Sequence, residues 1–206
     1  ESNDGRLKTI VTSYKDKNGV VINKDNLGVR WNGYIINKFP QETMTTFQGT
    51  DIPLARWADV LLMYAESLIE LGENLQEAVD VINKVRERAF LTTSPTDSYA
   101  TYRAFNIIDP ITKEEFEKNY KVKIDDDLRK AVRHERRVEL AAEGLRYYDL
   151  MRWGIFVEKI RAFYKTPEGI ATEKGSNISE NTWPYPIPQA EIDKVGGALV
   201  QNDNYK

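Results

Sequence analysis

The stretch from residue 128 to residue 154, LRKAVRHERRVELAAEGLRYYDLMRWG, carries the clearest helical signal in the chain. It predicts a helix that opens at Asp125 or Asp126 and buries one apolar stripe: Leu128, Ala131, Val132, Val138 and Ala142. Gly144 is a suitable end for this helix, because glycine accepts the left-handed backbone of a C-cap. A shorter helix is then predicted to continue to Trp153.

The same stretch holds three glutamates at four-residue spacing, Glu135, Glu139 and Glu143. A row of this kind can serve acid/base chemistry or bind a metal ion. Arginines are interleaved at offsets of three and four residues, and these would neutralise the row: Arg136, Arg137, Arg146 and Arg152. We therefore interpret the charges as structural, joining helix to helix and helix to loop.

The chain lacks a recognisable catalytic motif. His134 precedes Glu135, but position 138 is valine and His134 is the only histidine, so the second ligand of a zinc-binding helix is missing. No serine nucleophile elbow and no glycine-rich phosphate loop are present. We expect a protein that is not an enzyme, with no cofactor and no metal site. A glycoside hydrolase stays open as an alternative, because 32 acidic residues make some carboxylate pair inevitable.

Upstream, residues 51–90 predict an antiparallel helical hairpin. Asp51 can cap its first helix, whose first turn accepts Pro53, and Gly72 would end it. Apolar residues recur there at steps of three and four: Leu54, Ala58, Leu61, Leu62, Ala65, Leu68 and Ile69. The second helix has its own stripe: Ala78, Val81, Ile82, Val85 and Ala89. The small residues approach the spacing of a tetratricopeptide repeat, a unit that is stable only when it stacks on neighbours.

The remaining segments lack a sustained helical period. Residues 1–50 predict an irregular lead-in with a small β-hairpin, formed by residues 7–14 and 20–23 around Asn18-Gly19. Residues 91–124 predict a long loop excursion. Within it, Thr112 and Glu115 have the spacing of a capping box, which predicts a short helix over residues 113–120.

Two further regions complete the division of the chain. Residues 125–154 are the helical region described first. Residues 155–206 predict a C-terminal extended segment with one or two helical turns, because prolines at every second position from 184 to 188 exclude a helix.

Composition narrows the classes of partner. The 29 basic and 32 acidic residues give a net charge of -3, and no basic run offers the concentrated positive face that nucleic acid requires. No apolar stretch reaches the roughly 18–20 residues of a bilayer span. Cysteine is absent, so the chain forms no disulfide. Four Trp, eleven Tyr and seven Phe, many of them outside the predicted helices, favour a recognition function.

Four blocks of the sequence, in this order, resemble the C-terminal region of the SusD/RagB family. They are DIPLAR (51–56) with LLMYAE (61–66); INKVRERA (82–89); ERRVEL (135–140) with EGLR (143–146) and DLMRWG (149–154); and PIP (186–188) with Glu191 and Gln201-Asn202. Together they span roughly residues 50–206. Four blocks in the right order make the resemblance specific.

The resemblance implies a mostly α, SusD-like fold, with one tetratricopeptide-like hairpin, further helices and long irregular loops. Residues 1–206 would be the C-terminal region, and the N-terminal half, with its signal peptide and lipid-attachment cysteine, would lie outside them. The implied function is capture of oligosaccharides at the surface of the outer membrane and delivery to a SusC-like TonB-dependent transporter. Contact with the membrane would be made only through that lipid anchor, and no nucleic acid is expected.

Sugar binding would rest on aromatic rings in the irregular segments, because a ring stacks on the C–H face of a sugar while polar groups bond its hydroxyls. The candidates are Trp31, Tyr34, Tyr99, Tyr102, Phe105 and Tyr120. The alternative for each ring is that it covers the hairpin as satellite core. Rings within the helical motifs are instead expected in the core: Trp57, Tyr147, Tyr148, Trp153 and Phe156. A tetratricopeptide-like module that binds a protein or peptide also stays open.

Overall fold

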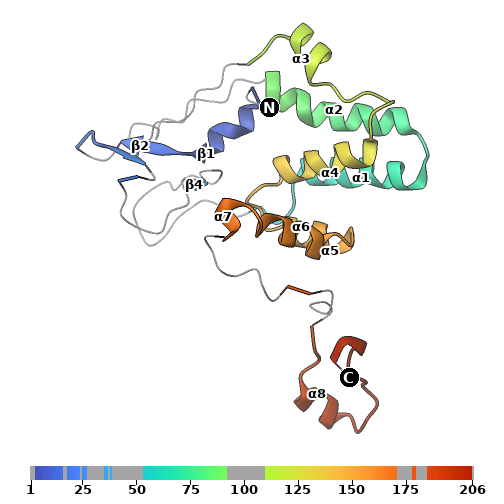
Figure 1. Ribbon diagram of the computed structural model, residues 1–206. Helices are drawn as coiled ribbons and strands as arrows, with labels where there is room; N and C mark the ends of the chain where they lie inside the picture. Colours follow the sequence, from blue (N-terminus) through green and yellow to red (C-terminus); the bar gives the residue numbers. More distant parts are fainter. Residues whose placement is uncertain are drawn as a thin grey trace. The chain divides into compact units, whose positions relative to one another are not determined.

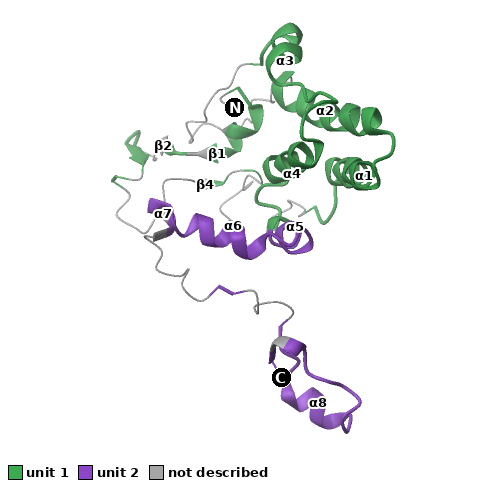
Figure 2. Ribbon diagram, turned by 45° about the vertical axis from the view of Figure 1, so that its right-hand side comes forward, with its two compact units in different colours: residues 1–146 green, residues 147–206 purple. Residues whose placement is uncertain are grey.

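The computed structural model describes residues 3–15, 18–23, 25–26, 35–36, 38, 53–91, 110–170, 178–179 and 185–205. The chain divides into two compact units, residues 1–146 and residues 147–206 (Figure 2). Helices predominate among the described residues and the strands are short, which confirms the mostly α fold that the sequence predicts.

The core of the first unit is formed by α1 (Trp57–Leu71), α2 (Leu75–Leu91) and α4 (Leu128–Glu139) (Figure 1). Helices α1 and α2 form the predicted hairpin, and α4 packs against both. The core lies where the three helices meet: Leu62, Ala65, Leu68, Ala78, Val79, Ile82, Val85, Val122, Leu128 and Val132. Gly72 ends α1 as predicted, with a φ of 72° in the left-handed region.

The predicted start of α1 is wrong. Pro53, which was expected in the first turn, is not helical, and the helix begins at Trp57; Asp51 lies outside the described residues. Arg56 is the N-cap, with φ -142° and ψ 160°, and its side chain makes no cap hydrogen bond. Its guanidinium is instead bound to two glutamates near the end of α4, and this tertiary contact overrides the local capping signal.

Helix α4 also differs from its predicted bounds. Asp127, one or two residues later than expected, caps it by accepting a hydrogen bond from the Lys130 N–H at 3.0 Å. The helix ends at Glu139, because the Glu139 carbonyl accepts from Arg56 Nη2 at 2.5 Å and from Lys38 Nζ at 2.6 Å. Gly144 closes the following turn with a φ of 77°.

The early end of α4 at Glu139 affects two predictions made from the sequence. Ala142, expected in the buried stripe, is exposed and has a φ of 66°. The predicted shorter helix is present as α5 (Arg146–Arg152), the first helix assigned mainly to the second unit.

The N-terminal segment only partly matches the predicted hairpin. Strands β2 (Ser13–Lys15) and β3 (Val21–Asn23) pair antiparallel across the Asn18-Gly19 turn, as expected. The preceding residues instead form a 3-10 helix, η1 (Gly5–Thr9), because the Asp4 carboxylate caps it by accepting from the Arg6 N–H at 2.9 Å. Strands β1 (Ile10–Val11) and β4 (Ile35–Ile36) form a second short antiparallel pair.

Helix α3 (Lys113–Asn119) lies where the sequence predicts it. Thr112 Oγ1 accepts from the Glu115 N–H at 3.2 Å, which confirms the predicted cap. Phe116 of this helix belongs to a small second core with Phe90 and Ala89 of α2.

The described residues of the second unit also form α6 (Phe156–Phe163), α7 (Pro167–Ile170), α8 (Gln189–Lys194) and a 3-10 turn, η4 (Asp203–Tyr205). Residues 185–188 are not helical, as their prolines require. Among the described residues, no helix is both long and apolar enough to cross a bilayer.

Two of the rings expected in the core are exposed. Trp57 keeps 65% of its surface and Tyr148 keeps 64%. Trp57 lies in the first turn of α1, since the helix starts later than predicted, and the core stripe begins beyond it. Tyr147, Trp153 and Phe156 are half-buried.

Candidate functional site

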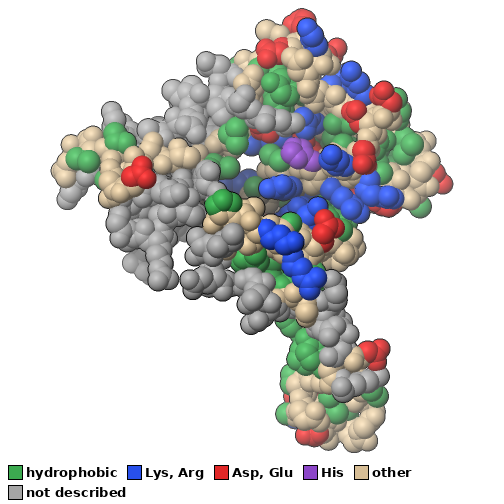
Figure 3. Space-filling view, in the orientation of Figure 1, with side chains coloured by type: hydrophobic (Ala, Val, Ile, Leu, Met, Phe, Trp, Pro, Cys, Tyr) green, Lys and Arg blue, Asp and Glu red, His purple; other side chains and the backbone are tan. Residues whose placement is uncertain are grey.

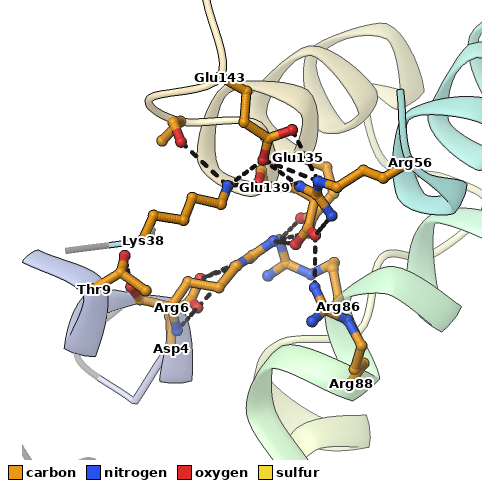
Figure 4. Close-up of polar contacts among 11 residues, drawn as sticks. Asp4, Arg6, Thr9, Lys38, Arg56, Arg86, Arg88, Glu135, Glu139 and Glu143 are labelled. Carbon is orange, nitrogen blue, oxygen red and sulfur yellow. Dashed lines mark hydrogen bonds and ion pairs between the residues drawn. The ribbon is translucent and has the colours of Figure 1, made fainter. Parts of the chain in front are cut away.

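The glutamates of α4 point into the protein, where cations from other elements surround them (Figure 4). Glu135 is completely buried. Its Oε1 accepts from Arg6 Nη1 of η1 at 2.5 Å, and its Oε2 accepts from Arg86 Nη1 of α2 at 2.8 Å. Each carboxylate oxygen is therefore bound by a guanidinium.

Glu139 lies one turn further along the same face and is equally buried. Its Oε1 accepts from Arg56 Nη1 and from Arg88 Nη2, both at 2.6 Å, and its Oε2 accepts from Arg6 Nη1 at 3.0 Å. Three segments of the chain thus meet at one carboxylate.

Glu143 completes the row after the helix has ended. Arg56 Nε donates to both of its oxygens, at 2.9 and 2.8 Å, and Lys38 forms an ion pair with it. Burial alone would raise the pKa of Glu143, but the hydrogen bonds from Arg56 and Lys38 outweigh it and hold that pKa below its ordinary value. Burial is also the main reason why the pKa of Lys38 is lowered, although Glu143 opposes it.

Arg6 connects this row to the start of the chain. Its Nε and Nη2 donate to the Asp4 carboxylate at 2.8 and 2.6 Å, while its Nη1 donates to the two glutamates of α4. Burial by itself lowers the pKa of Arg6, but hydrogen bonding to Asp4 and the charge of Glu135 raise it above its ordinary value. The guanidinium is permanently charged, so it fixes η1 to α4.

The interpretation of these charges as structural agrees with the geometry, but the predicted partners are wrong. Arg136 pairs with Asp59 of α1 at 2.9 Å rather than with the glutamate row. Arg137 stands two residues from Glu135 and from Glu139, about 160° away around the helix axis, so it does not lie beside that row. Arg136 is only three residues from Glu139, but its guanidinium is engaged by α1. The neutralising cations come instead from η1, from α2, from Arg56 just before α1 and from Lys38 just after β4.

This arrangement leaves no carboxylate placed for chemistry in the row. Both oxygens of each glutamate are engaged by arginines or lysine, so none is positioned to take a proton from a substrate. Within the part of the chain that the structure describes, no three His, Cys, Asp or Glu side chains are grouped as metal ligands.

The lowered pKa of Glu143 gives a pH prediction. A carboxyl group whose pKa is lower in the folded state stabilises the fold above its ordinary value of 4.5, and that contribution is lost as pH falls through the lowered pKa. Glu143→Gln should therefore destabilise the protein at neutral pH, and its difference from the wild type should shrink at about pH 3.

Urea unfolding at both pH values measures this difference. Glu73→Gln, at an exposed position beyond α1, is the control and should show no such convergence. A difference between wild type and Glu143→Gln that stays constant between the two pH values would contradict the prediction.

Of the six ring residues predicted to bind sugar, the structure describes Tyr120. Trp31, Tyr34, Tyr99, Tyr102 and Phe105 lie outside the described residues. Tyr120 is half-buried and stacks on Phe90, with ring centroids 4.6 Å apart and an angle of 27° between the planes. Its backbone oxygen accepts from Arg86 Nε at 2.9 Å, so the position of this residue is fixed from two sides.

Sequence reasoning missed the cations that hold the glutamate row. Arg86 and Arg88 stand at the end of α2, where they also suit the helix dipole, and Arg56 had no predicted function. The signal that could have indicated these cations was their place in the sequence blocks that resemble the SusD/RagB family. Arg56 belongs to the first, Arg86 and Arg88 to the second and the glutamates to the third, and the structure joins these charged residues in one network.

Comparisons with known proteins identify the family of this chain. The family model described as the SusD family matches residues 6–205. The chain is 26% identical over 196 residues to SusD-like protein P2 of Formosa agariphila, covering 94% of this chain and 33% of that protein. It is 33% identical over 151 residues to SusD-like protein P25 of the same organism, covering 72% of this chain and 23% of that protein.

A third relative is the starch-binding protein SusD of Bacteroides thetaiotaomicron, 27% identical over 178 residues, which cover 86% of this chain and 26% of that protein. The chain thus spans a third or less of the length of these curated relatives. The comparison with solved structures finds no match.

The class defined by fold and charge network is a mostly helical scaffold in which the glutamate row of residues 135, 139 and 143 is structural. The chain belongs to the SusD family, because the family model covers nearly its whole length. Proteins of this family bind nutrients, glycans among them, at the outer membrane, and are typically lipoproteins that are binding proteins rather than enzymes.

Proposed function

We propose that this chain is part of a nutrient-binding protein on the surface of the outer membrane, which captures oligosaccharides and delivers them to a SusC-like TonB-dependent transporter. Family membership supports the class of function. The observation that carries the proposal is that Glu135, Glu139 and Glu143 are all held in ion pairs. Because arginines and a lysine neutralise all three, the α4 region serves as scaffold, and recognition falls to the rings of the irregular segments.

The candidate rings for this binding are Trp31, Tyr34, Tyr99, Tyr102, Phe105 and Tyr120. Tyr120 illustrates how the scaffold can hold such a ring. Phe90 of α2 supports one face of it, and Arg86 holds its backbone. A ring fixed before the ligand arrives loses little conformational freedom on binding, which favours affinity.

Replacing Trp31 with alanine tests the proposal. If the ring stacks on a sugar face, the affinity for the bound glycan should fall about five- to tenfold, the equivalent of about 1–1.4 kcal/mol. Isothermal titration calorimetry with a panel of neutral oligosaccharides, starch oligosaccharides included, measures the affinity of both proteins.

Trp57→Ala is the matched control, because this tryptophan is exposed on α1 and is not among the candidate rings. It should bind the glycan as the wild type does. Absence of heat with every oligosaccharide, or equal losses in the two variants, would count against sugar binding through these rings.

One observation favours a second candidate, a module that binds another protein. Helix α1 and the residues just before it expose a set of large apolar side chains: Leu54, Trp57, Val60, Met63, Tyr64 and Leu71. Exposed apolar surface of this kind is typical of protein contacts. A pulldown that recovers a transporter, together with no glycan affinity in calorimetry, would favour this module over the nutrient-binding protein.

A further inference from the structure

Two exposed tyrosines of the second unit belong to one cluster of rings. Tyr148 of α5 keeps 64% of its surface, and Tyr185, which precedes α8, keeps 59%. Half-buried Tyr147 joins them, because its ring contacts that of Tyr148 at 5.4 Å between centroids and its hydroxyl is hydrogen-bonded to Tyr185. Figure 3 shows hydrophobic side chains, the class that includes tyrosine, at the surface of the C-terminal segment that contains α8. We call Tyr147, Tyr148 and Tyr185 the tyrosine cluster.

Helix α5 directs Tyr148 outward, because Asp149 and Leu150 are buried on its inner side. Arg152 follows Tyr148 by four residues and therefore lies on the same side of the helix. Its Nε and Nη2 donate to Asp149 Oδ1 at 3.0 and 2.8 Å, while 44% of its side chain stays exposed. The outer side of α5 thus presents a phenol ring beside a guanidinium.

Edge contacts fix the orientation of the rings on α5. The planes of Tyr147 and Tyr148 stand at 81° to each other, and Tyr147 meets Phe156 of α6 at 5.2 Å between centroids and 79° between planes. In such a contact one ring turns its edge to the face of the other, so Tyr147 covers at most one face of Tyr148. The hydrogen bond with Tyr185 is the main reason why the pKa of Tyr147 is raised. Tyr148 is therefore oriented by its neighbour and still has a ring face that this neighbour leaves uncovered.

Tyr185 is held through its backbone. Asn202 Nδ2 donates to the Tyr185 carbonyl at 2.6 Å. Two residues on, the Ile187 N–H donates to Gln201 Oε1 at 2.8 Å, and Gln201 Nε2 donates back to the Ile187 carbonyl at 2.9 Å. Pro186 between them has a fixed φ. A ring on a segment fixed in this way loses little conformational freedom when a ligand binds.

The chemistry of this surface suits a sugar better than a protein partner. The exposed apolar set of α1 and the residues before it includes aliphatic side chains, Leu54, Met63 and Leu71 among them, which need another apolar surface to cover them. Among the residues of α5, all of which the structure describes, the exposed large apolar side chain is that of Tyr148. A phenol ring stacks on the C–H face of a sugar, and a guanidinium donates to the hydroxyls at its rim.

We propose that the tyrosine cluster is a further binding site for neutral oligosaccharides, in which Tyr148 and Tyr185 stack on sugar faces and Arg152 donates to sugar hydroxyls. The site is additional to the candidate rings of the irregular segments. It uses two rings, Tyr147 and Tyr148, that the sequence assigns to the core. This inference rests on the proposed function and assigns a second site to the same class of ligand.

The test is calorimetry with the panel of neutral oligosaccharides on the wild type, Tyr148→Ala and Tyr185→Ala. The wild type should bind two oligosaccharides per chain. In each alanine variant one of the two affinities should fall about fivefold, because one ring stack is lost. Tyr148→Phe keeps the ring and should retain both affinities.

The matched control is Tyr64→Ala, which removes an exposed tyrosine of α1 outside the cluster. It should retain both affinities. Unchanged affinities in Tyr148→Ala and Tyr185→Ala, or equal losses in Tyr64→Ala, would overturn the proposal. If the two cluster variants keep both affinities but no longer capture a co-expressed SusC-like transporter, the cluster is a protein interface and the proposal is wrong.

The number of oligosaccharides bound separates this inference from the function on which it rests. If the wild type binds one oligosaccharide per chain, with an affinity that depends on Trp31 and not on Tyr148, only the inference about the cluster is wrong. If the wild type binds none of the panel, the proposed nutrient-binding function fails as well. The affinity that Tyr148→Ala retains at the other site shows that this variant is folded.

Discussion

Replacing Glu135 with glutamine should lower the free energy of unfolding by about 3–5 kcal/mol. The carboxylate is completely buried and binds Arg6 and Arg86 with separate oxygens. A glutamine of the same shape removes the negative charge and places an amide NH₂, itself a donor, against a guanidinium. Because both arginines stay charged, the variant leaves positive charge in the interior without its partner.

Urea unfolding followed by circular dichroism measures this loss. The control is Glu70→Gln, which removes the carboxylate of the exposed pair with Arg129 and should cost only about 0–1 kcal/mol. The comparison isolates burial, since both changes remove one carboxylate from an arginine. A loss below about 1 kcal/mol for Glu135→Gln would mean that the network is solvated and does not hold the segments together.

A large loss would also establish how the chain is assembled around α4. Arg6 and Glu135 are 129 residues apart in the sequence, and Lys38 and Glu139 are 101 residues apart. Closing loops of this length costs conformational entropy, so strong interactions are needed to offset the loss. Charge-assisted hydrogen bonds among buried groups can supply that strength.

The same separations explain which parts of the fold the sequence could predict. Gly72 ends α1 and Thr112 caps α3 as predicted, because each signal depends on neighbours within a few residues. The start of α1 and the end of α4 could not be predicted. The guanidinium of Arg56 acts at both places, joined by Lys38 at the end of α4, and the partners of these cations in the glutamate row are more than 80 residues away.

The candidate site could also be predicted only in part. The structural character of the glutamate row could be predicted from the abundance of arginine, but the identity of the partners depends on packing between elements. Trp57 shows the limit of composition, since its large apolar ring predicts a core position whereas the observed start of α1 exposes it. The candidate rings of the irregular segments remain predictions, because all except Tyr120 lie outside the described residues.

Phe90 supports the one candidate ring that the structure places, and its replacement with alanine should cost about 3–5 kcal/mol of folding free energy. Its side chain is only 1% exposed. It stacks on Tyr120 at 4.6 Å between centroids, meets Phe116 at 5.8 Å, and lies 5.5 Å from the guanidinium carbon of Arg86. Alanine would open a cavity between α2 and α3 and remove three ring contacts at once.

Phe90→Leu separates the cavity from the ring stack. Leucine fills most of the volume, so its cost should be smaller, about 1–1.5 kcal/mol, while Tyr120 still loses the ring beneath it. Phe163→Ala, at a ring that is 47% exposed on α6, is the control and should cost less than about 1 kcal/mol. Urea unfolding ranks the three variants by their free energy of unfolding. Calorimetry then measures the glycan affinity of Phe90→Leu and so tests whether Tyr120 takes part in binding. If Phe90→Leu folds stably yet binds the sugar more weakly, the stack positions Tyr120 for recognition; unchanged affinity would assign Tyr120 to the core alone.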